Sequence, residues 1–432
     1  MELSPVTNRA HFPVLPTAWL RWTQNAAIFA CCANLFSTAL ANLGFAAFLL
    51  LFLGLCISGE RRWLNTQSFP SGVALAIGIY IGWQAVGLSY TDAPLSYGLK
   101  NLFSERKICY VLPLALIFSD PEPKRRFLVA FLTIASIGLA ASFLISKLPI
   151  EIWTPLFWVD DKRVVSRLLA ENQFVFRSNV TQGMVFALSA FLALWFSLQQ
   201  SRPVRKWGLR ALAAAFTLNI AWVTHGRSGY VVFLVLVVWA FAMWRGWRGV
   251  MTGMLVAGLL AGFAFYASPT VQNRVMSGVN EARTFATEPE ETSLGKRMIL
   301  YETTLELIKN KPVFGLGTGA FRKHYSELVA EKYHGWQSEP ADDPHSQYLF
   351  VTVENGLIGL TTFLLLIGAL LRYCLKDRSP YGRMAAGCVI AWSVTSLFSG
   401  HFRTFPEGHL IAFIVGILMV NRPSDDSSKR AG

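Results

Sequence analysis

The chain has 432 residues, of which 53% are apolar and only 15% are charged, yet its formal net charge is +13. Soluble domains carry about 25% charged residues, so this composition excludes a water-soluble enzyme, a disordered chain and a DNA-binding domain. Apolar runs of about 18 or more residues recur along the sequence, which indicates a polytopic membrane protein with an all-α fold. The basic excess must therefore be explained by its position relative to the membrane.

Residues 1–267 are predicted to form the first nine membrane-spanning helices of about twelve. Every second connection carries a cluster of Arg and Lys, and the positive-inside rule places such short connections in the cytoplasm. We therefore expect both termini on the cytoplasmic side. The clusters lie at 61–62, 124–126, 202–210, 245–248 and 372–383. The nine predicted spans are 22–40, 43–58, 71–89, 106–119, 125–147, 179–199, 207–223, 229–244 and 249–267.

Residues 268–345 form a long polar connection of about 78 residues, which we expect on the opposite side of the membrane. The positive-inside rule does not apply to long connections. About half of the 39 Lys and Arg residues lie outside by this assignment, mostly here and at 90–107 and 148–178. Membrane insertion gives no reason for these basic residues, so they are candidates for function.

The long loop contains a predicted helix and a glycine-rich turn. Ser293 is a plausible N-cap for a helix that runs to about Asn310 and stops before a Lys-Pro pair. This helix places Arg297 and Tyr301 along one face. The glycines at 315–319 follow no predicted strand, so a closely packed turn or an approach to a sugar or phosphate is favoured over dinucleotide binding.

His345 ends the long loop, immediately before the last three predicted spans in residues 346–432. The positive end of a helix dipole opposes protonation of a nearby imidazole, which suits a general base at neutral pH. The alternative is an interfacial histidine that only holds the loop by hydrogen bonds. The last three predicted spans are 346–371, 383–399 and 407–421.

Several basic side chains lie at the expected outer ends of the spans. Arginine binds phosphate through paired hydrogen bonds, so several arginines that converge on one cavity would form a pyrophosphate site. For any single arginine, the alternative is an interfacial contact or an ion pair. The stronger candidates are Arg177, Arg227 and Arg297, and the weaker ones are Arg106, Lys107 and Arg403.

Asp342, Asp343 and His345 raise the question of a divalent metal ion. An Asp-Asp-Pro sequence is also ordinary turn chemistry, and arginines can neutralise a pyrophosphate leaving group without a metal. We therefore predict no metal and no cofactor, while metal assistance through these residues remains the alternative.

Taken together, these motifs resemble the O-antigen ligase family, which belongs to a wider ligase and polymerase superfamily of bacterial membrane enzymes. The resemblance extends over nearly the full chain in span number and loop placement. Each motif is short, and their order and spacing make the resemblance specific. The motifs are Gly226-Arg227-Ser228-Gly229, the Arg297-to-Tyr301 segment with the glycine turn after it, Pro344-His345-Ser346-Gln347-Tyr348-Leu349 and Glu354-Asn355-Gly356.

The resemblance implies a GT-C-like glycosyltransferase of the inner membrane with its active site facing the periplasm. The donor would be O-antigen linked to undecaprenyl pyrophosphate, and the acceptor a sugar hydroxyl of the lipid A core. Carried onto this chain, His345 would be the general base, and Arg227 and Arg297 would bind the pyrophosphate. Arg177 is a less certain addition, matched by its position. Membrane lipids are further expected partners, and the basic residues outside indicate an anionic lipid substrate and not nucleic acid.

Three other functions remain open. An O-antigen polymerase would use the same donor with a growing glycan as acceptor. A protein O-oligosaccharyltransferase of the same superfamily would glycosylate a protein. A transporter of lipid-linked sugars should place ionisable residues near the bilayer centre and often has repeated halves, whereas the candidate residues here gather at one face.

Overall fold

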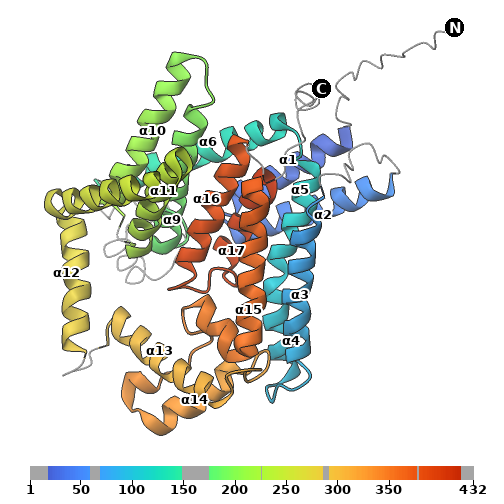
Figure 1. Cartoon of the computed structure of the whole chain (residues 1–432), viewed down its shortest axis with the longest axis vertical. Helices are drawn as coiled ribbons and strands as arrows, with labels where there is room; N and C mark the ends of the chain where they lie inside the picture. Colours follow the sequence, from blue (N-terminus) through green and yellow to red (C-terminus); the bar gives the residue numbers. More distant parts are fainter. Residues whose placement is uncertain are drawn as a thin grey trace, which may run out of the picture.

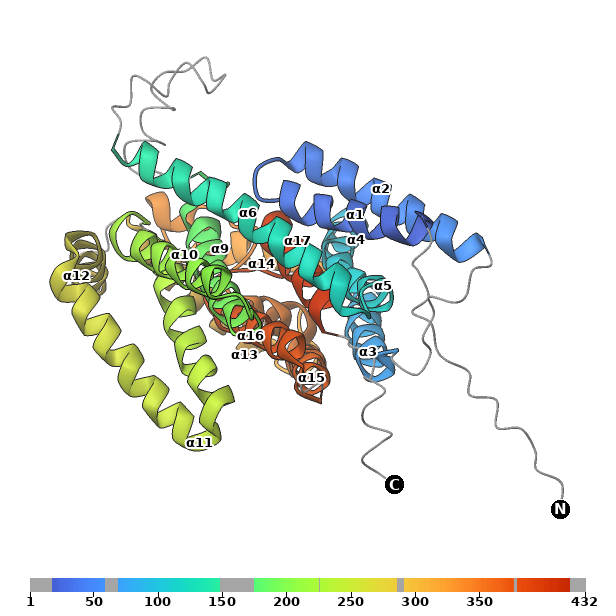
Figure 2. The same cartoon turned by 90° about the horizontal axis from the view of Figure 1, so that it is seen from above.

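The structure is a computed structural model that describes residues 18–58, 69–147, 175–224, 226–285, 291–376 and 379–419. All regular elements in these ranges are helices, which confirms the all-α fold class. The predicted basic cluster at 61–62, most of the connection at 148–178 and both termini lie outside the described residues. Figures 1 and 2 show the arrangement of the helices from two directions.

The described residues before the long loop form ten helical elements, close to the predicted spans. They are α1 (Ala18–Ala33), α2 (Thr38–Ile57), α3 (Ser71–Gly87), α4 (Leu95–Ser104), the 3₁₀ helix η3 (Glu105–Tyr110), α5 (Val111–Ile117), α6 (Pro121–Ile145), α9 (Asn179–Ser197), α10 (Pro203–Trp222) and α11 (Arg227–Ala267).

The turn between the first two helices lies earlier than predicted. The expected spans 22–40 and 43–58 meet at Ala41, but α1 ends at Ala33 and α2 begins at Thr38. The cause is Ser37, whose hydroxyl accepts a hydrogen bond from the Leu40 N–H at 3.3 Å and so caps α2. The hydroxyl of this N-cap therefore fixes the start of α2 a few residues before the break at 41–42 that hydropathy predicted.

The predicted fourth span is also longer than expected at its start. The connection at 90–107 was expected to be a loop, but α4 begins at Leu95 and continues through η3 into α5. The 3₁₀ turns in the middle bring Glu105 and Lys107 into the protein, where both side chains are buried. The polar residues that suggested a loop therefore lie inside the helical assembly.

Helix α11 is two predicted spans joined by a sharp turn. The helical dihedral angles break at Arg245 and Gly246, where Gly246 has a φ of 57°. Figure 2 shows the two arms side by side. Gly253 lies against the opposite arm, because a Cβ there would stand 2.8 Å from the Cα of Val238. The predicted separation into 229–244 and 249–267 is therefore confirmed at the level of helices.

Helix α9 lies at the centre of the assembly. In the most apolar 18-residue stretch of α9, 83% of the residues are buried, whereas in that of α11 only 11% are buried. Gly183 of α9 packs on Gly229 of α11, since a Cβ on Gly183 would lie 3.0 Å from the Gly229 Cα. Side chains of α9 join those of α1, α6, α15, α16 and α17 in one continuous apolar core.

The helices of the long loop are α12 (Pro269–Thr284), α13 (Ser293–Asn310), α14 (Phe321–Lys332) and the 3₁₀ turn η5 (Gly335–Ser338). In Figure 1, α13 and α14 lie at the lower end of the assembly, and α12 runs down along its left side from α11. The predicted helix of this loop is confirmed, but its N-cap is Thr292 and not Ser293. The Thr292 hydroxyl accepts from the Gly295 N–H at 3.0 Å.

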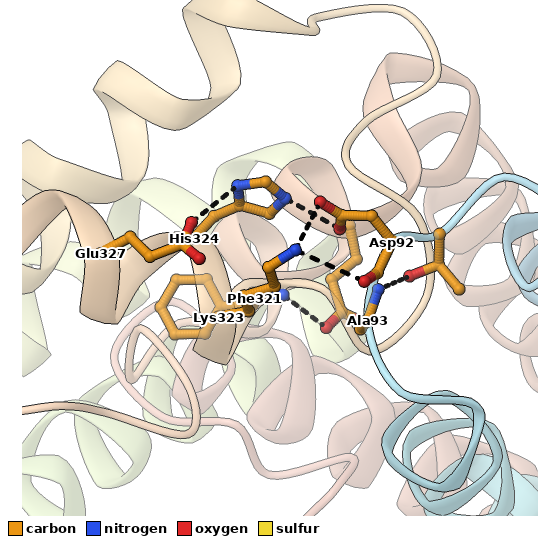
Figure 3. A network of polar contacts seen from close by, with 8 residues as sticks. Asp92, Ala93, Phe321, Lys323, His324 and Glu327 are labelled. Atoms are coloured by element: carbon orange, nitrogen blue, oxygen red, sulfur yellow. Dashed lines mark hydrogen bonds and ion pairs between the residues drawn. The ribbon is translucent and has the colours of Figure 1, made fainter.

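Two contacts hold α14 in place. Lys323 and His324 both lie 3.0 Å from the Asp92 carboxylate, which belongs to the segment before α4 (Figure 3). A separate small apolar core then packs Leu300 and Leu307 of α13 with Phe321 and Tyr325 of α14. The loop helices thus form an ordered layer with its own packing.

The last three helices are α15 (Gln347–Lys376), α16 (Pro380–Thr395) and α17 (Phe405–Leu418). Helix α15 was predicted as one continuous span, but it is interrupted at Gly356, where φ is 66°. Backbone N–H groups after the break are satisfied by the loop, since Leu357 N donates to Pro312 O at 2.8 Å. Residues 347–355 therefore form a short half-helix under the loop.

Among the described residues, five helices are long and apolar enough to cross a membrane. This supports a membrane protein, and the predicted number of twelve spans stays a prediction. The five are Thr38–Ile57, Pro121–Ile145, Asn179–Ser197, Arg227–Ala267 and Gln347–Lys376, with two shorter apolar helices at Ser71–Gly87 and Phe405–Leu418.

Candidate active site

His345 lies at the junction between the loop layer and α15 with an unusual backbone. Its φ is 51°, the only positive φ outside glycine in the described ranges. Such a conformation costs about 1–3 kcal/mol and is often retained at functional sites. Pro344 and the first turn of α15 fix the chain on either side, and the imidazole remains 53% exposed. The backbone thus presents this side chain to the outside of the helical assembly.

Asp343 orients His345. Its Oδ1 accepts from the His345 backbone N–H at 2.7 Å and lies 3.3 Å from the imidazole Nδ1. Burial would raise the pKa of Asp343, but its hydrogen bonds with His345 and the charges of His345 and Arg403 bring that pKa below its usual value. A carboxylate beside Nδ1 favours the tautomer with the proton on Nδ1, which leaves Nε2 free to accept a proton.

The predicted face of α13 meets this junction. The Tyr301 hydroxyl lies 3.4 Å from the carbonyl oxygens of His345 and Leu397, so it joins α13 to the turn before α15 and to the end of α16. Arg297 lies one turn earlier on the same face. Because the observed helix covers Ser293–Asn310, the four-residue spacing of Arg297 and Tyr301 puts them on one face, as predicted.

The buried imidazole of His401 is influenced by the charges of both Arg297 and Asp343. Burial lowers the pKa of His401, the charge of Glu407 opposes this, Arg297 lowers the pKa further and Asp343 raises it. These charges reach one imidazole from α13, from the turn before α15 and from α17. The direct contact between α13 and the turn before α15 is made by Tyr301, which lies one turn after Arg297 and reaches the His345 carbonyl oxygen, so this face of α13 lies against that turn.

Arg227 begins α11 and is held by an acidic partner on α12. Its Nη2 lies 2.8 Å from the Glu281 carboxylate. Burial would raise the pKa of Glu281, but hydrogen bonds from Ser277 and Arg227 lower it below its usual value. Glu281 also accepts from the Leu294 N–H at 3.2 Å, at the start of α13. Arg227 is thus linked to the helix that carries Arg297, and its side chain is 41% exposed.

Arg227 on α11 and Arg297 on α13 are linked through Glu281 of α12, but no direct contact between the two arginines is present in the described part of the chain. Glu281 was missed from the sequence because it is 54 residues from its partner. Its position on a helix of the long loop gave no signal. Asp343, in contrast, is two residues from His345, and an Asp at that spacing often accepts from the backbone of its neighbour.

The remaining predicted binding residues all have partners within the protein. Arg177 donates to the Asn34 carbonyl at 3.0 Å and to the Thr38 hydroxyl, and so ties the α1–α2 turn to the start of α9. Arg106 donates to the Phe103 carbonyl at 2.9 Å and lies over its ring. Their predicted part in substrate binding stays a prediction.

Lys107 and Arg403 belong to a buried polar layer beneath the loop. The Lys107 ammonium donates to the carbonyl oxygens of Phe402 and Arg403, which fixes the turn before α17. The Arg403 guanidinium donates to Asn101 at 2.6 Å and stacks 3.8 Å over the Phe350 ring. These contacts support the elements around the site, and substrate binding by either residue is also untested.

The glycine-rich turn packs closely, one of the two alternatives that the sequence favoured. Gly315, Gly317 and Gly319 all have positive φ, and a Cβ on Gly317 would lie 2.5 Å from the Thr91 Cα. The turn donates hydrogen bonds into the break of α15, from Gly317 N to the Glu354 carbonyl at 2.8 Å. Its glycines are required by this close backbone approach.

The carboxylates of the metal alternative, Asp342 and Asp343, lie at the turn before α15. No group of three or more His, Cys, Asp or Glu side chains in these ranges is arranged to hold a metal. Asp342 pairs with Arg322 at 2.5 Å, and Asp343 is occupied by His345. The two neighbouring carboxylates therefore serve different partners.

The fold and this polar region define a helical membrane protein with a histidine, its acidic partner and arginines at one end. Residues 212–364 match the family model described as O-antigen ligase (Wzy_C). The predicted resemblance to the O-antigen ligase family is thereby confirmed, and the matched segment contains Arg227, Arg297, Tyr301 and His345. This supports an enzyme of the ligase or polymerase type.

A protein of Haemophilus influenzae, described as an uncharacterized protein, is similar as well. It is 19% identical over 310 residues, which cover 71% of this chain and 73% of that relative. This relative extends the similarity beyond the matched family segment, and its description adds no activity.

Proposed function

We propose that this protein is an O-antigen ligase of the bacterial inner membrane. It transfers a glycan from undecaprenyl pyrophosphate to a sugar hydroxyl of the lipid A core, on the periplasmic side. The observation that carries the proposal is the Asp343–His345 pair, which lies beside the Arg297 face of α13 within the segment that matches the family. The termini are cytoplasmic in this proposal.

The reaction follows from the chemistry of these residues. His345 Nε2 accepts the proton of the acceptor hydroxyl as the oxygen attacks the anomeric carbon of the donor. The bond from that carbon to the pyrophosphate oxygen breaks, and undecaprenyl pyrophosphate leaves with the electron pair. Direct displacement inverts the anomeric centre.

Arg227 and Arg297 stabilise the charge that develops on the leaving pyrophosphate. Charge-assisted hydrogen bonds from arginine to phosphate are among the strongest in proteins, and stabilisation of developing charge is usually the largest catalytic term. Glu281 keeps Arg227 in place through their 2.8 Å ion pair. Because two arginines can supply this stabilisation, the proposed reaction is metal-independent.

Two related functions share this chemistry, and the product separates them from the ligase. The protein is reconstituted in vesicles with a lipid-linked glycan, and core lipid is offered as the acceptor. A ligase attaches the glycan to core lipid. A polymerase extends the lipid-linked glycan instead, a protein O-oligosaccharyltransferase requires a protein acceptor, and a transporter moves the donor across the bilayer without forming a glycosidic bond.

A further inference from the structure

A cavity of about 300 Å³ lies within the loop layer and reaches His345. Its walls come from α13, α14, the 3₁₀ turn η5 and the segment that leads into α15. The volume is at the small end of the range for ligand pockets, about 300–1,000 Å³, which matches a single sugar unit at the end of a glycan.

The lining of the cavity combines aromatic rings with a side-chain amide. Trp336 and Gln337 come from η5, and Tyr325 comes from α14, where its ring stacks on Phe321 with the centroids 5.2 Å apart. Trp336 and Gln337 are each partly buried, and within the described ranges neither side chain is hydrogen-bonded. An aromatic face beside a free amide is suited to a sugar ring, which has apolar C–H faces and hydroxyls at its edge.

The charges around the cavity disfavour an anionic ligand. Its ionisable lining consists of Lys296 against Glu339, Asp342 and Asp343, beside His345. Lys296 is already paired with Glu339 and with Glu291, each at 2.9 Å. A pyrophosphate would therefore meet an excess of carboxylates here.

The arginines of the proposed donor site, Arg227 and Arg297, do not line this cavity. Tyr301, one turn after Arg297 on α13, reaches the His345 carbonyl oxygen at 3.4 Å, so His345 lies where this face of α13 meets the acidic cavity. A base at such a boundary can take a proton from a group held in the cavity while the electrophile approaches along this face of α13.

We propose that this cavity binds the accepting sugar, as an uncharged ring that stacks on Trp336 and presents a hydroxyl to His345. Gln337 and Asp342 hydrogen-bond the other hydroxyls and select the ring's orientation. This assignment rests on the proposed transferase function, and it adds the place and the chemical class of the acceptor group.

The kinetic test varies acceptor and donor separately for the Trp336→Ala variant. Loss of the stacking surface should raise the KM for core lipid about tenfold, with the donor KM and kcat within about twofold of the wild type. Trp336→Phe should restore most of the acceptor affinity, and Gln337→Ala should raise the same KM. Trp247→Ala, at an exposed position in the α11 turn, serves as the matched control and should change neither KM.

A second measurement needs no turnover. Saturation-transfer NMR of deacylated core oligosaccharide should detect binding to the wild type and to His345→Ala in nanodiscs, and lose the signal with Trp336→Ala. Unchanged binding in Trp336→Ala, or no binding to the wild type, would overturn the acceptor site. A raised donor KM in that variant would assign the cavity to the donor glycan instead.

The two measurements also separate the two proposals. If wild-type protein transfers no glycan to any acceptor but still binds the oligosaccharide through Trp336, the transferase proposal fails and the sugar site stands. If transfer proceeds and the Trp336 variants bind and react as the wild type does, the sugar site fails alone. If Trp336→Ala does not fold, the acceptor KM of Gln337→Ala tests the sugar site instead, with Trp336→Phe as the conservative variant.

Discussion

Replacement of Asp343 by Asn tests how the acidic partner contributes to the proposed base. The carboxylate lies 3.3 Å from the His345 Nδ1 and also accepts the His345 backbone N–H at 2.7 Å. When Nε2 takes a proton, the imidazole becomes a cation, and a carboxylate stabilises it more than a neutral amide does. Hydrogen bonds to charged groups contribute about 1.5–3 kcal/mol. Loss of that amount in the transition state lowers kcat about 10- to 100-fold.

The assay is steady-state transfer of glycan to core lipid by reconstituted protein at saturating donor and acceptor. Asp343→Asn should lower kcat while the donor KM stays close to the wild-type value, because the arginines are untouched. Glu331→Gln removes an exposed carboxylate from the same loop and is the matched control. A kcat within twofold of the wild type for Asp343→Asn would refute the positioning role. An unchanged melting temperature would exclude a general folding defect.

Four further predictions follow from the same structure. Glu281→Gln should raise the donor KM several-fold, because Arg227 loses its anionic partner, as measured by initial rates at varied donor. Folding lowers the pKa of Glu281 below its usual value of 4.5. The ionised Glu281 therefore stabilises the fold above that pH, and this contribution is lost as the pH falls through the lower folded pKa. Protease cleavage near α12 should rise only in that acidic range. Gly317→Ala should lower the melting temperature, since it adds a Cβ at a φ of 101° against Thr91, whereas Gly368→Ala, in open space on α15, should not. Transfer should continue in excess chelator, and loss of turnover there would revive the metal alternative.

Local signals predicted the loop helix well. A capping residue, a three-to-four-residue face and a Lys-Pro stop place α13 within one residue of its observed start, with Arg297 and Tyr301 on one face. The position of His345 before α15 also follows from the sequence. These features depend on neighbours within a few residues, which is why the amino-acid order alone reveals them.

Features that depend on distant contacts were not predictable. The break in α15 at Gly356 requires the Pro312 carbonyl to accept from Leu357, and hydropathy cannot show that a distant turn fills the gap. The pairing of Arg227 with Glu281 joins residues far apart in the sequence. The cavity beside Trp336 exists only because α13, α14 and the segment before His345 fold together.

The most direct test of the central claim is glycan transfer by the His345→Ala variant, reconstituted beside wild type and a His334→Ala control. His334 is an exposed histidine of the same loop layer. The proposed mechanism predicts that His345→Ala binds the lipid-linked donor normally but attaches no detectable glycan to core lipid, while His334→Ala behaves as the wild type. Attachment at the wild-type rate by His345→Ala would contradict the assignment of the base and the mechanism built on it.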